Sequence, residues 1–219
     1  MAVPAADAVR RADAQRNRGL LLEAAAQAFA EGGIDVTAGE IARRAGVAKG
    51  TLFRHFPAKS DLVAAVLIDR LAQLRLLIGE VTQARAAGLE AVAEIMRRGA
   101  EVLAADRSFF DGAMAHVERD SSLRREKLAL EAALDGLVAA AQAAGEVRGD
   151  VRGSDLAMLM MAATNTCAPT QDVYPDLWRR YLALMIDSLR PGEVTPLPVA
   201  PLNGAAMLAS AGADACRPA

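Results

Sequence analysis

The sequence predicts an all-α protein of about nine helices, and three observations support this. Aromatic residues make up only 4% of the 219 residues, and runs of β-branched residues are scarce. Local propensity therefore favours helices nearly everywhere before Pro191. Several segments repeat apolar residues with the period of a helix turn, and a hydrophobic content of 53% is enough for one large core or two smaller ones.

We expect four consecutive parts. They are a flexible basic arm over residues 1–15, a small helical domain over residues 16–60, a larger helical domain over residues 61–190 and a flexible tail over residues 191–219. The tail is assigned because prolines and glycines interrupt the uncharged stretch that follows Val194. The same interruptions argue against a membrane span, which needs a continuous apolar helix.

Charge is unevenly distributed along the chain. The formal net charge is -2, but residues 1–60 hold nine Lys and Arg against six Asp and Glu, so the net charge is +3 there and -5 in the remainder. This asymmetry is typical of a basic nucleic-acid reader joined to an acidic body. Four arginines near the start of the chain form either a DNA-contacting arm or a solvated tail. They are Arg10, Arg11, Arg16 and Arg18.

Three short helices are expected in the small domain. The first covers residues 16–31, where apolar residues fall on one stripe before two glycines. The second should begin at Thr37, because Thr37 and Glu40 form a capping box in which the hydroxyl accepts from the Glu40 amide and the Glu40 carboxylate reaches back. Gly46 should end it in the left-handed conformation. The third covers residues 48–56 and is closed by a proline.

The second and third of these helices, with their glycine-containing turn, form a helix-turn-helix unit. In such a unit the second helix enters the major groove of DNA while the first crosses the backbone. Ile41, Ala42, Leu52 and Phe56 supply its small core. Each outward residue alone would also fit a solvated helix face, but together they offer cations and donors for phosphates and base edges. The candidate DNA-binding residues are Thr37, Arg43, Arg44, Lys49, Gly50, Thr51, Phe53, Arg54, His55 and Lys59.

A family resemblance rests on the same stretch. The segments that carry it are Glu23-Ala24-Ala25, Phe29-Ala30-Glu31-Gly32-Gly33, Ile41-Ala42, Ala45-Gly46-Val47 and Gly50-Thr51-Leu52-Phe53-Arg54-His55-Phe56. Residues 21–62 closely resemble the N-terminal domain of TetR-family regulators, and the rest of the chain is loosely similar to an SbtR-like C-terminal domain. The resemblance implies a DNA-binding domain joined by a fourth helix to a variable ligand-binding and dimerisation domain, acting usually as a ligand-released repressor.

The resemblance also assigns individual positions. Those that match places where family members often touch DNA are Thr37, Lys49, Thr51, Phe53, His55 and Lys59. Phe53 stands where the family commonly has tyrosine, so a hydroxyl contact to phosphate is lost. Ala48 replaces a frequent serine, which removes an N-cap worth about 0.5 to 2 kcal/mol. Gly39 lacks the side chain with which some relatives reach DNA.

Six further helices are expected in the larger domain, over residues 58–79, 89–104, 109–117, 123–144, 155–166 and 176–189. Methionines and phenylalanines among them offer an adaptable apolar lining for a ligand, since thioethers repack easily. Ordinary core packing is the alternative for each. The candidate ligand-binding residues are Met96, Phe109, Phe110, Met114, Met158, Met161 and Asn165.

The last two helices are apolar over more of their surface than the outer helices of a monomer should be. Pairing with a symmetry mate would bury this surface in a four-helix bundle, as the resemblance also implies. The candidate dimer-interface residues are Leu156, Leu159, Ala163, Leu177, Trp178, Tyr181, Leu184 and Met185.

The resemblance implies a cytoplasmic homodimer that binds a palindromic operator in double-stranded DNA and is released by a small apolar or amphipathic effector. A DNA-binding architectural or adaptor protein without ligand control is one alternative, and a helical enzyme is another. The enzyme is disfavoured because a Gly-rich phosphate loop, H-E-x-x-H and G-x-S-x-G are all missing from the sequence. We expect no metal or cofactor, because Cys167 and Cys216 lie far apart and the chain has two histidines.

Overall fold

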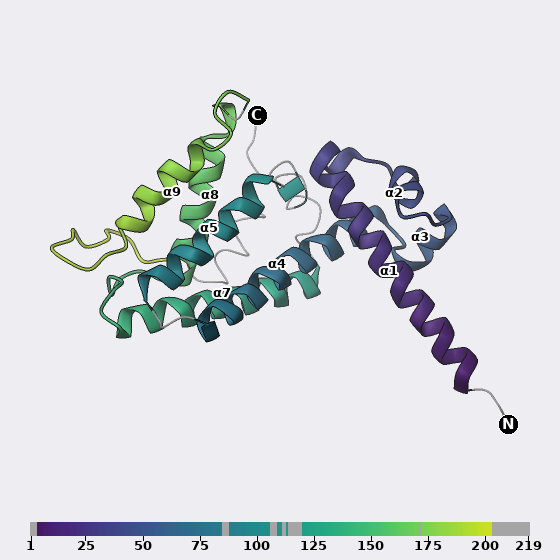
Figure 1. Ribbon diagram of the computed structural model, residues 1–219, viewed down its shortest axis with the longest axis horizontal. Helices are drawn as coiled ribbons and strands as arrows, with labels where there is room; N and C mark the ends of the chain where they lie inside the picture. The colour runs from purple at the N-terminus through teal and green to yellow at the C-terminus, as the bar shows by residue number, and fades with distance from the viewer. Residues whose placement is uncertain are drawn as a thin grey trace, which may run out of the picture. The chain divides into compact units, whose positions relative to one another are not determined.

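The computed structural model describes residues 4–84, 88–105, 109–110, 113, 120–170 and 172–202, with the backbone alone at 4–12 and 168. These residues form eight α-helices and two short 3₁₀ turns, without a strand among them (Figure 1). The predicted all-α class is therefore confirmed. The chain divides into two compact units, one made of residues 1–69 and 106–120 and the other of residues 70–105 and 121–219.

The first unit is built around α1 (Pro4–Gly32), which is followed by η1 (Gly33–Asp35), α2 (Ala38–Arg44), α3 (Lys49–His55) and the start of α4 (Lys59–Ala84). Its core consists of apolar side chains from all four helices. They include Leu21, Ala25, Phe29, Ile41, Leu52, Phe56 and Leu62. The Phe109 ring stacks on Phe29 with a centroid distance of 5.2 Å and an interplanar angle of 10°.

Helix α1 begins much earlier than the sequence pattern indicated. The sequence predicts a flexible basic arm over residues 1–15 and a first helix over residues 16–31, whereas residues 4–15 belong to α1. Pro4 occupies the first helical position, where the missing N–H costs nothing, and the following residues are mostly alanine and arginine, which are strong helix formers. Figure 1 shows the first turns of α1 extending beyond α2 and α3.

The second unit contains the rest of α4 together with α5 (Leu89–Ala105), α7 (Ser121–Ala143), α8 (Gly153–Thr166), η2 (Ala168–Thr170) and α9 (Leu177–Asp187). Helix α8 lies at its centre and contacts α5, α7 and α9. The crossing with α7 is close, because a Cβ atom on Gly153 would lie 2.6 Å from the backbone nitrogen of Asp135. Glycine at this position therefore lets the two helices approach each other.

The predicted helices of this unit agree with α5, α7, α8 and α9 to within a few residues. Of the helix predicted over residues 109–117, the structure describes Phe109, Phe110 and Ala113 as helical. Beyond α9, residues 191–202 are irregular and exposed, and the flexibility of the tail stays a prediction. Among the described residues, no helix is both long and apolar enough to cross a membrane.

Candidate functional site

The turn between α2 and α3 is determined by local sequence. The Thr37 hydroxyl accepts a hydrogen bond of 3.2 Å from the backbone N–H of Glu40, and α2 starts at the next residue after Thr37, as predicted. After α2 the chain turns at Gly46, which has a φ of 67°. This left-handed conformation favours glycine because it has no Cβ atom, so the predicted end of the helix is confirmed.

Helix α3 buries one side and leaves the other open. Leu52 is fully buried, and it packs in the same small core as Ile41 and Phe56. Ala48 precedes α3 in extended conformation and makes no side-chain cap, as the alanine at this position implied. Backbone hydrogen bonds and the buried Leu52 side therefore hold this seven-residue helix in place.

The open side of α3 gathers the predicted DNA-binding residues of that helix. Lys49, Gly50, Phe53 and Arg54 are exposed, and Thr51 and His55 are half-buried. The Arg54 Nη2 atom donates to Thr51 Oγ1 at 3.0 Å. The Lys49 ammonium lies 5.8 Å from the centre of the Phe53 ring. This surface combines cations, a hydroxyl and an apolar ring, which suit phosphates, base edges and the thymine methyl group.

Gly50 leaves room on this surface. A Cβ atom at Gly50 would have no heavy atom within 4 Å, so a larger residue would fit in the free protein. Packing within the described part of the chain therefore does not require glycine at this position, and the predicted close approach to DNA stays a prediction.

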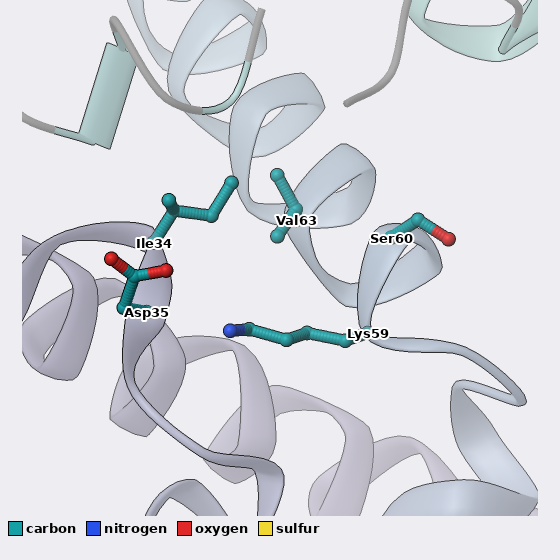
Figure 2. A pocket seen from close by; sticks show the side chains of 5 residues that line it. All are labelled: Ile34, Asp35, Lys59, Ser60 and Val63. Carbon is teal, nitrogen blue, oxygen red and sulfur yellow. The ribbon is translucent and has the colours of Figure 1, made fainter. Parts of the chain in front are cut away.

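Thr37 and Lys59 lie at the starts of two other helices. Thr37 is exposed in front of α2. Lys59 lines a hollow of about 70 Å³ together with Ile34, Asp35, Ser60 and Val63. Figure 2 shows the Lys59 side chain extended across this hollow, with its ammonium end toward Asp35. Its predicted phosphate contact stays a prediction.

Arg43 and Arg44 are both held by Glu40. Arg43 donates to both Glu40 oxygens, at 2.9 and 2.7 Å, and Arg44 donates to Glu40 at 2.9 Å and to Glu31 at 2.6 Å. The second half of the predicted capping box is therefore wrong. Instead of reaching back to Thr37, the Glu40 carboxylate binds the two guanidinium groups, because their positive charges add a Coulomb attraction that a neutral backbone N–H lacks.

This pairing predicts a pH dependence of stability. The hydrogen bonds from Arg43 and then Arg44 lower the pKa of Glu40 from 4.5 to about 2. A carboxyl group whose pKa is lowered on folding stabilises the protein above its ordinary pKa and loses this contribution as the pH falls through the folded value. In urea denaturation at a series of pH values, the stability difference between wild type and Glu40→Gln should therefore be constant above pH 5 and shrink from about pH 4.5 toward pH 2. A stability difference between wild type and Glu40→Gln that stays constant down to pH 2 would contradict the predicted role of the Glu40 carboxylate.

Arg18 has a contact that the sequence did not indicate. Its guanidinium carbon lies 5.2 Å from the centre of the Phe56 ring, at the end of α3. We had placed Arg18 in an arm that meets DNA or solvent, whereas it joins α1 to the helix-turn-helix unit. A cation over an aromatic face contributes about 0.5 to 1 kcal/mol at an exposed site. Only the fold brings these two residues together.

The structure does not gather the predicted ligand-binding residues. Met96 is fully buried in the second unit, and Phe109 is buried in the first, with Phe110 half-buried beside it at a centroid distance of 5.8 Å. Met158, Met161 and Asn165 are exposed on α8, and their part in ligand binding stays a prediction. Met114 lies outside the described residues.

The predicted dimer-interface residues divide into three groups. Leu156, Ala163 and Trp178 are buried within the subunit, so their expected place on an outer face is wrong. The half-buried residues Leu159, Leu177 and Met185 pack against the same core. Tyr181 and Leu184 are exposed, with relative exposures of 42% and 58%. The physical reason is that one stripe of each helix already packs on its neighbours, and only the opposite stripe is open.

Two family models match this chain, one over its N-terminal part and one over its C-terminal part. The model described as bacterial regulatory proteins of the tetR family matches residues 21–66, which contain the helix-turn-helix unit. The model described as the SbtR-like C-terminal domain of transcriptional regulators matches residues 88–191. Both parts of the sequence-based resemblance are therefore confirmed.

Two curated relatives come from Pseudomonas putida. The HTH-type transcriptional regulator SrpR is 39% identical over 66 residues, which are 30% of this chain and 31% of SrpR. The HTH-type transcriptional regulator TtgW is 38% identical over 66 residues, or 30% of this chain and 49% of TtgW. The matches therefore span less than half the length of either relative.

A solved structure extends the likeness over most of the chain. The TetR transcription regulatory protein from Mycobacterium vanbaalenii is 36% identical, with a TM-score of 0.64 over 83% of this chain and 99% of that protein. Its similarity covers both compact units rather than the DNA-binding part alone. The chain belongs to the TetR family of transcriptional regulators.

Proposed function

We propose that this regulator is a repressor whose homodimer binds a palindromic operator through α3 and leaves it when a small apolar or amphipathic molecule binds the second unit. Regulators of this family bind DNA and dimerise. The observation that carries the proposal is the open face of α3, where Lys49, Thr51 and Arg54 lie together on a helix that buries Leu52 on its other side.

A dimer is needed because each subunit presents a single α3. Successive major grooves on one side of the duplex are about 34 to 36 Å apart, so two recognition helices at this spacing meet two half-sites. We place the dimer contact on the exposed stripe of α8 and α9, which is formed by Met158, Met161, Tyr181 and Leu184. The two helices contact each other, and each carries exposed large apolar side chains, which are typical of such an interface.

The effector site is proposed in the core between α5 and α8. Met96 and Met160 are buried there, and a Cβ atom on Gly99 would lie 2.6 Å from the Met160 sulfur. The flexible thioether fills the space that Gly99 leaves open, so rotation of Met160 would create room for an apolar group. A ligand that prefers one spacing of the α3 helices would lower operator affinity by linkage.

The DNA-binding part is tested with the variant Lys49→Ala/Arg54→Ala. Each specific contact contributes about 1 to 3 kcal/mol, so the loss of two side chains from each subunit should weaken binding by at least about 100-fold. The probe is a duplex that wild-type protein selects from a random pool, measured by fluorescence polarisation. The matched control is Arg97→Ala, since Arg97 is an exposed arginine of α5 that is paired with Glu90 and Glu94. Full affinity of the double variant would contradict the proposed contact face.

A DNA-binding protein without ligand control is the second candidate. One observation favours it, namely that the predicted ligand-binding residues do not lie together: Met96 is buried in the second unit, Phe109 is buried in the first, and Met158 and Met161 are exposed. The two candidates are separated on the same duplex by adding apolar and amphipathic compounds to the bound complex. Release of DNA by any compound that also raises the melting temperature of wild-type protein would support the repressor.

A further inference from the structure

We infer that the adjacent arginines of α2 have different roles, with Arg43 binding the DNA backbone, Arg44 bracing α2 against α1, and Glu40 acting as the positioning residue for Arg43. This inference rests on the proposed DNA-binding function and deepens it. The sequence assigned both arginines to DNA. Each arginine uses two donors, but the two side chains differ in the number of carboxylates they contact and in their exposed fraction.

Arg44 is enclosed by two carboxylates. Its Nε atom donates to Glu40 Oε1 at 2.9 Å, and its Nη1 atom donates to Glu31 Oε2 at 2.6 Å. Glu31 belongs to the last turn of α1, so Arg44 joins two helices of the first unit. The Arg44 side chain is 30% exposed. Because both neighbours are anionic, its charge is compensated within the protein, and its guanidinium is used to hold α2 in position.

Arg43 is held on one edge only. Its Nε and Nη2 atoms donate to the two oxygens of Glu40 at 2.9 and 2.7 Å, while the side chain is 73% exposed. A guanidinium has five N–H donors in a rigid plane. The paired edge uses two of them, and Nη1 is not part of either bond. Glu40 therefore orients Arg43 without using the donors that a phosphate would need.

The charges in this group also differ between the two positions. Glu31 and Glu40 together balance Arg43 and Arg44, but both carboxylates contact Arg44, whereas Arg43 contacts Glu40 alone and shares it. The local excess of positive charge therefore lies at Arg43. In a helix-turn-helix unit the first helix crosses the DNA backbone, so the partner of an exposed cation there is a phosphate rather than a base edge.

The test compares Arg43→Ala, Arg44→Ala, Glu40→Gln and the control Arg97→Ala. Affinity for the duplex selected by wild-type protein is measured by fluorescence polarisation over a series of salt concentrations, and stability by urea denaturation. Arg43→Ala should weaken binding about tenfold or more and reduce the slope of log affinity against log salt by about 2 for the dimer. Its denaturation midpoint should fall less than that of Arg44→Ala, because the Arg43 side chain is 73% exposed and an exposed ion pair adds little stability. Arg44→Ala should lower the midpoint and leave the salt slope at its wild-type value.

The variant Glu40→Gln distinguishes the positioning of Arg43 by Glu40 from the effect of the negative charge of Glu40 on DNA binding. Removing an acidic group near DNA should tighten binding if only charge matters, whereas loss of the tether should weaken it by about 2- to 10-fold, which is the cost of ordering one long side chain. An unchanged salt slope in Arg43→Ala, a reduced slope in Arg44→Ala, or tighter binding by Glu40→Gln would overturn the inference. The variant Lys49→Ala/Arg54→Ala separates failure of this inference from failure of the proposed function. If that variant loses DNA binding while Arg43→Ala does not, the role of Arg43 is wrong but the α3 contact face is retained.

Discussion

Leu184→Glu is expected to convert the dimer to monomers and to weaken operator binding by about 100-fold or more, since linked binding of two modules commonly exceeds that of one by 10² to 10⁴. Leu184 is 58% exposed on α9, so the substitution leaves the core of the subunit intact. In the proposed dimer, however, the carboxylate would be buried without a partner and would face its own symmetry mate. Sedimentation velocity measures the assembly, and fluorescence polarisation measures the affinity.

The matched control for this experiment is Leu76→Glu. Leu76 is 60% exposed on α4, outside the stripe formed by Met158, Met161, Tyr181 and Leu184. It should stay dimeric and bind DNA as wild type does. The circular dichroism of both variants should show the wild-type helix content. If Leu184→Glu stays dimeric with wild-type affinity, the dimer contact does not lie on this stripe.

Phe29→Ala is expected to lower the free energy of unfolding by about 3 to 5 kcal/mol, the range for truncating a buried aromatic side chain. Phe29 has no exposed surface, and its ring stacks on Phe109 in the first unit. The truncation would leave a cavity beside α1 and remove the aromatic pair. Urea denaturation followed by circular dichroism measures this loss of stability. The first unit of the variant should unfold at a lower urea concentration than the first unit of the wild-type protein.

A neighbouring position on α1 provides the control. Leu20 is 41% exposed, so Leu20→Ala should change stability by about 0.5 kcal/mol or less, as is usual at a surface position. Phe29→Leu should lie between the two, because it keeps most of the apolar volume. Equal effects of Phe29→Ala and Leu20→Ala would show that the Phe29 side chain does not belong to a tightly packed core.

Features that depend on neighbours along the chain could be predicted from the sequence. The start of α2 at Thr37, the turn at Gly46 and the uncapped start of α3 after Ala48 all follow from hydrogen-bonding groups or backbone freedom within three or four residues. The open face of α3 followed from the position of Leu52 in the apolar pattern. The family resemblance rested on these same local features, which is why it was visible in a short stretch.

Other predictions failed because they depend on which partner a side chain meets. The capping box assigned the Glu40 carboxylate to a backbone N–H. In the folded protein Arg43 and Arg44 bind this carboxylate instead, and Arg44 also binds Glu31. The arm over residues 1–15 was inferred from charge alone, although helix propensity decided the conformation of residues 4–15. Arg18 could be assigned to Phe56 only after the fold had brought the two together.

Propensity, caps and periodicity act over one or two turns, so the helical class, most helix boundaries to within a few residues and the open face of α3 could all be predicted from the sequence alone. Which apolar residues of a helix are buried depends on how the helices pack together. Met160 is buried and Met161 is exposed, although they are adjacent on α8. The difference arises because α8 contacts α5, α7 and α9 at once, and burial depends on these neighbours rather than on hydrophobicity.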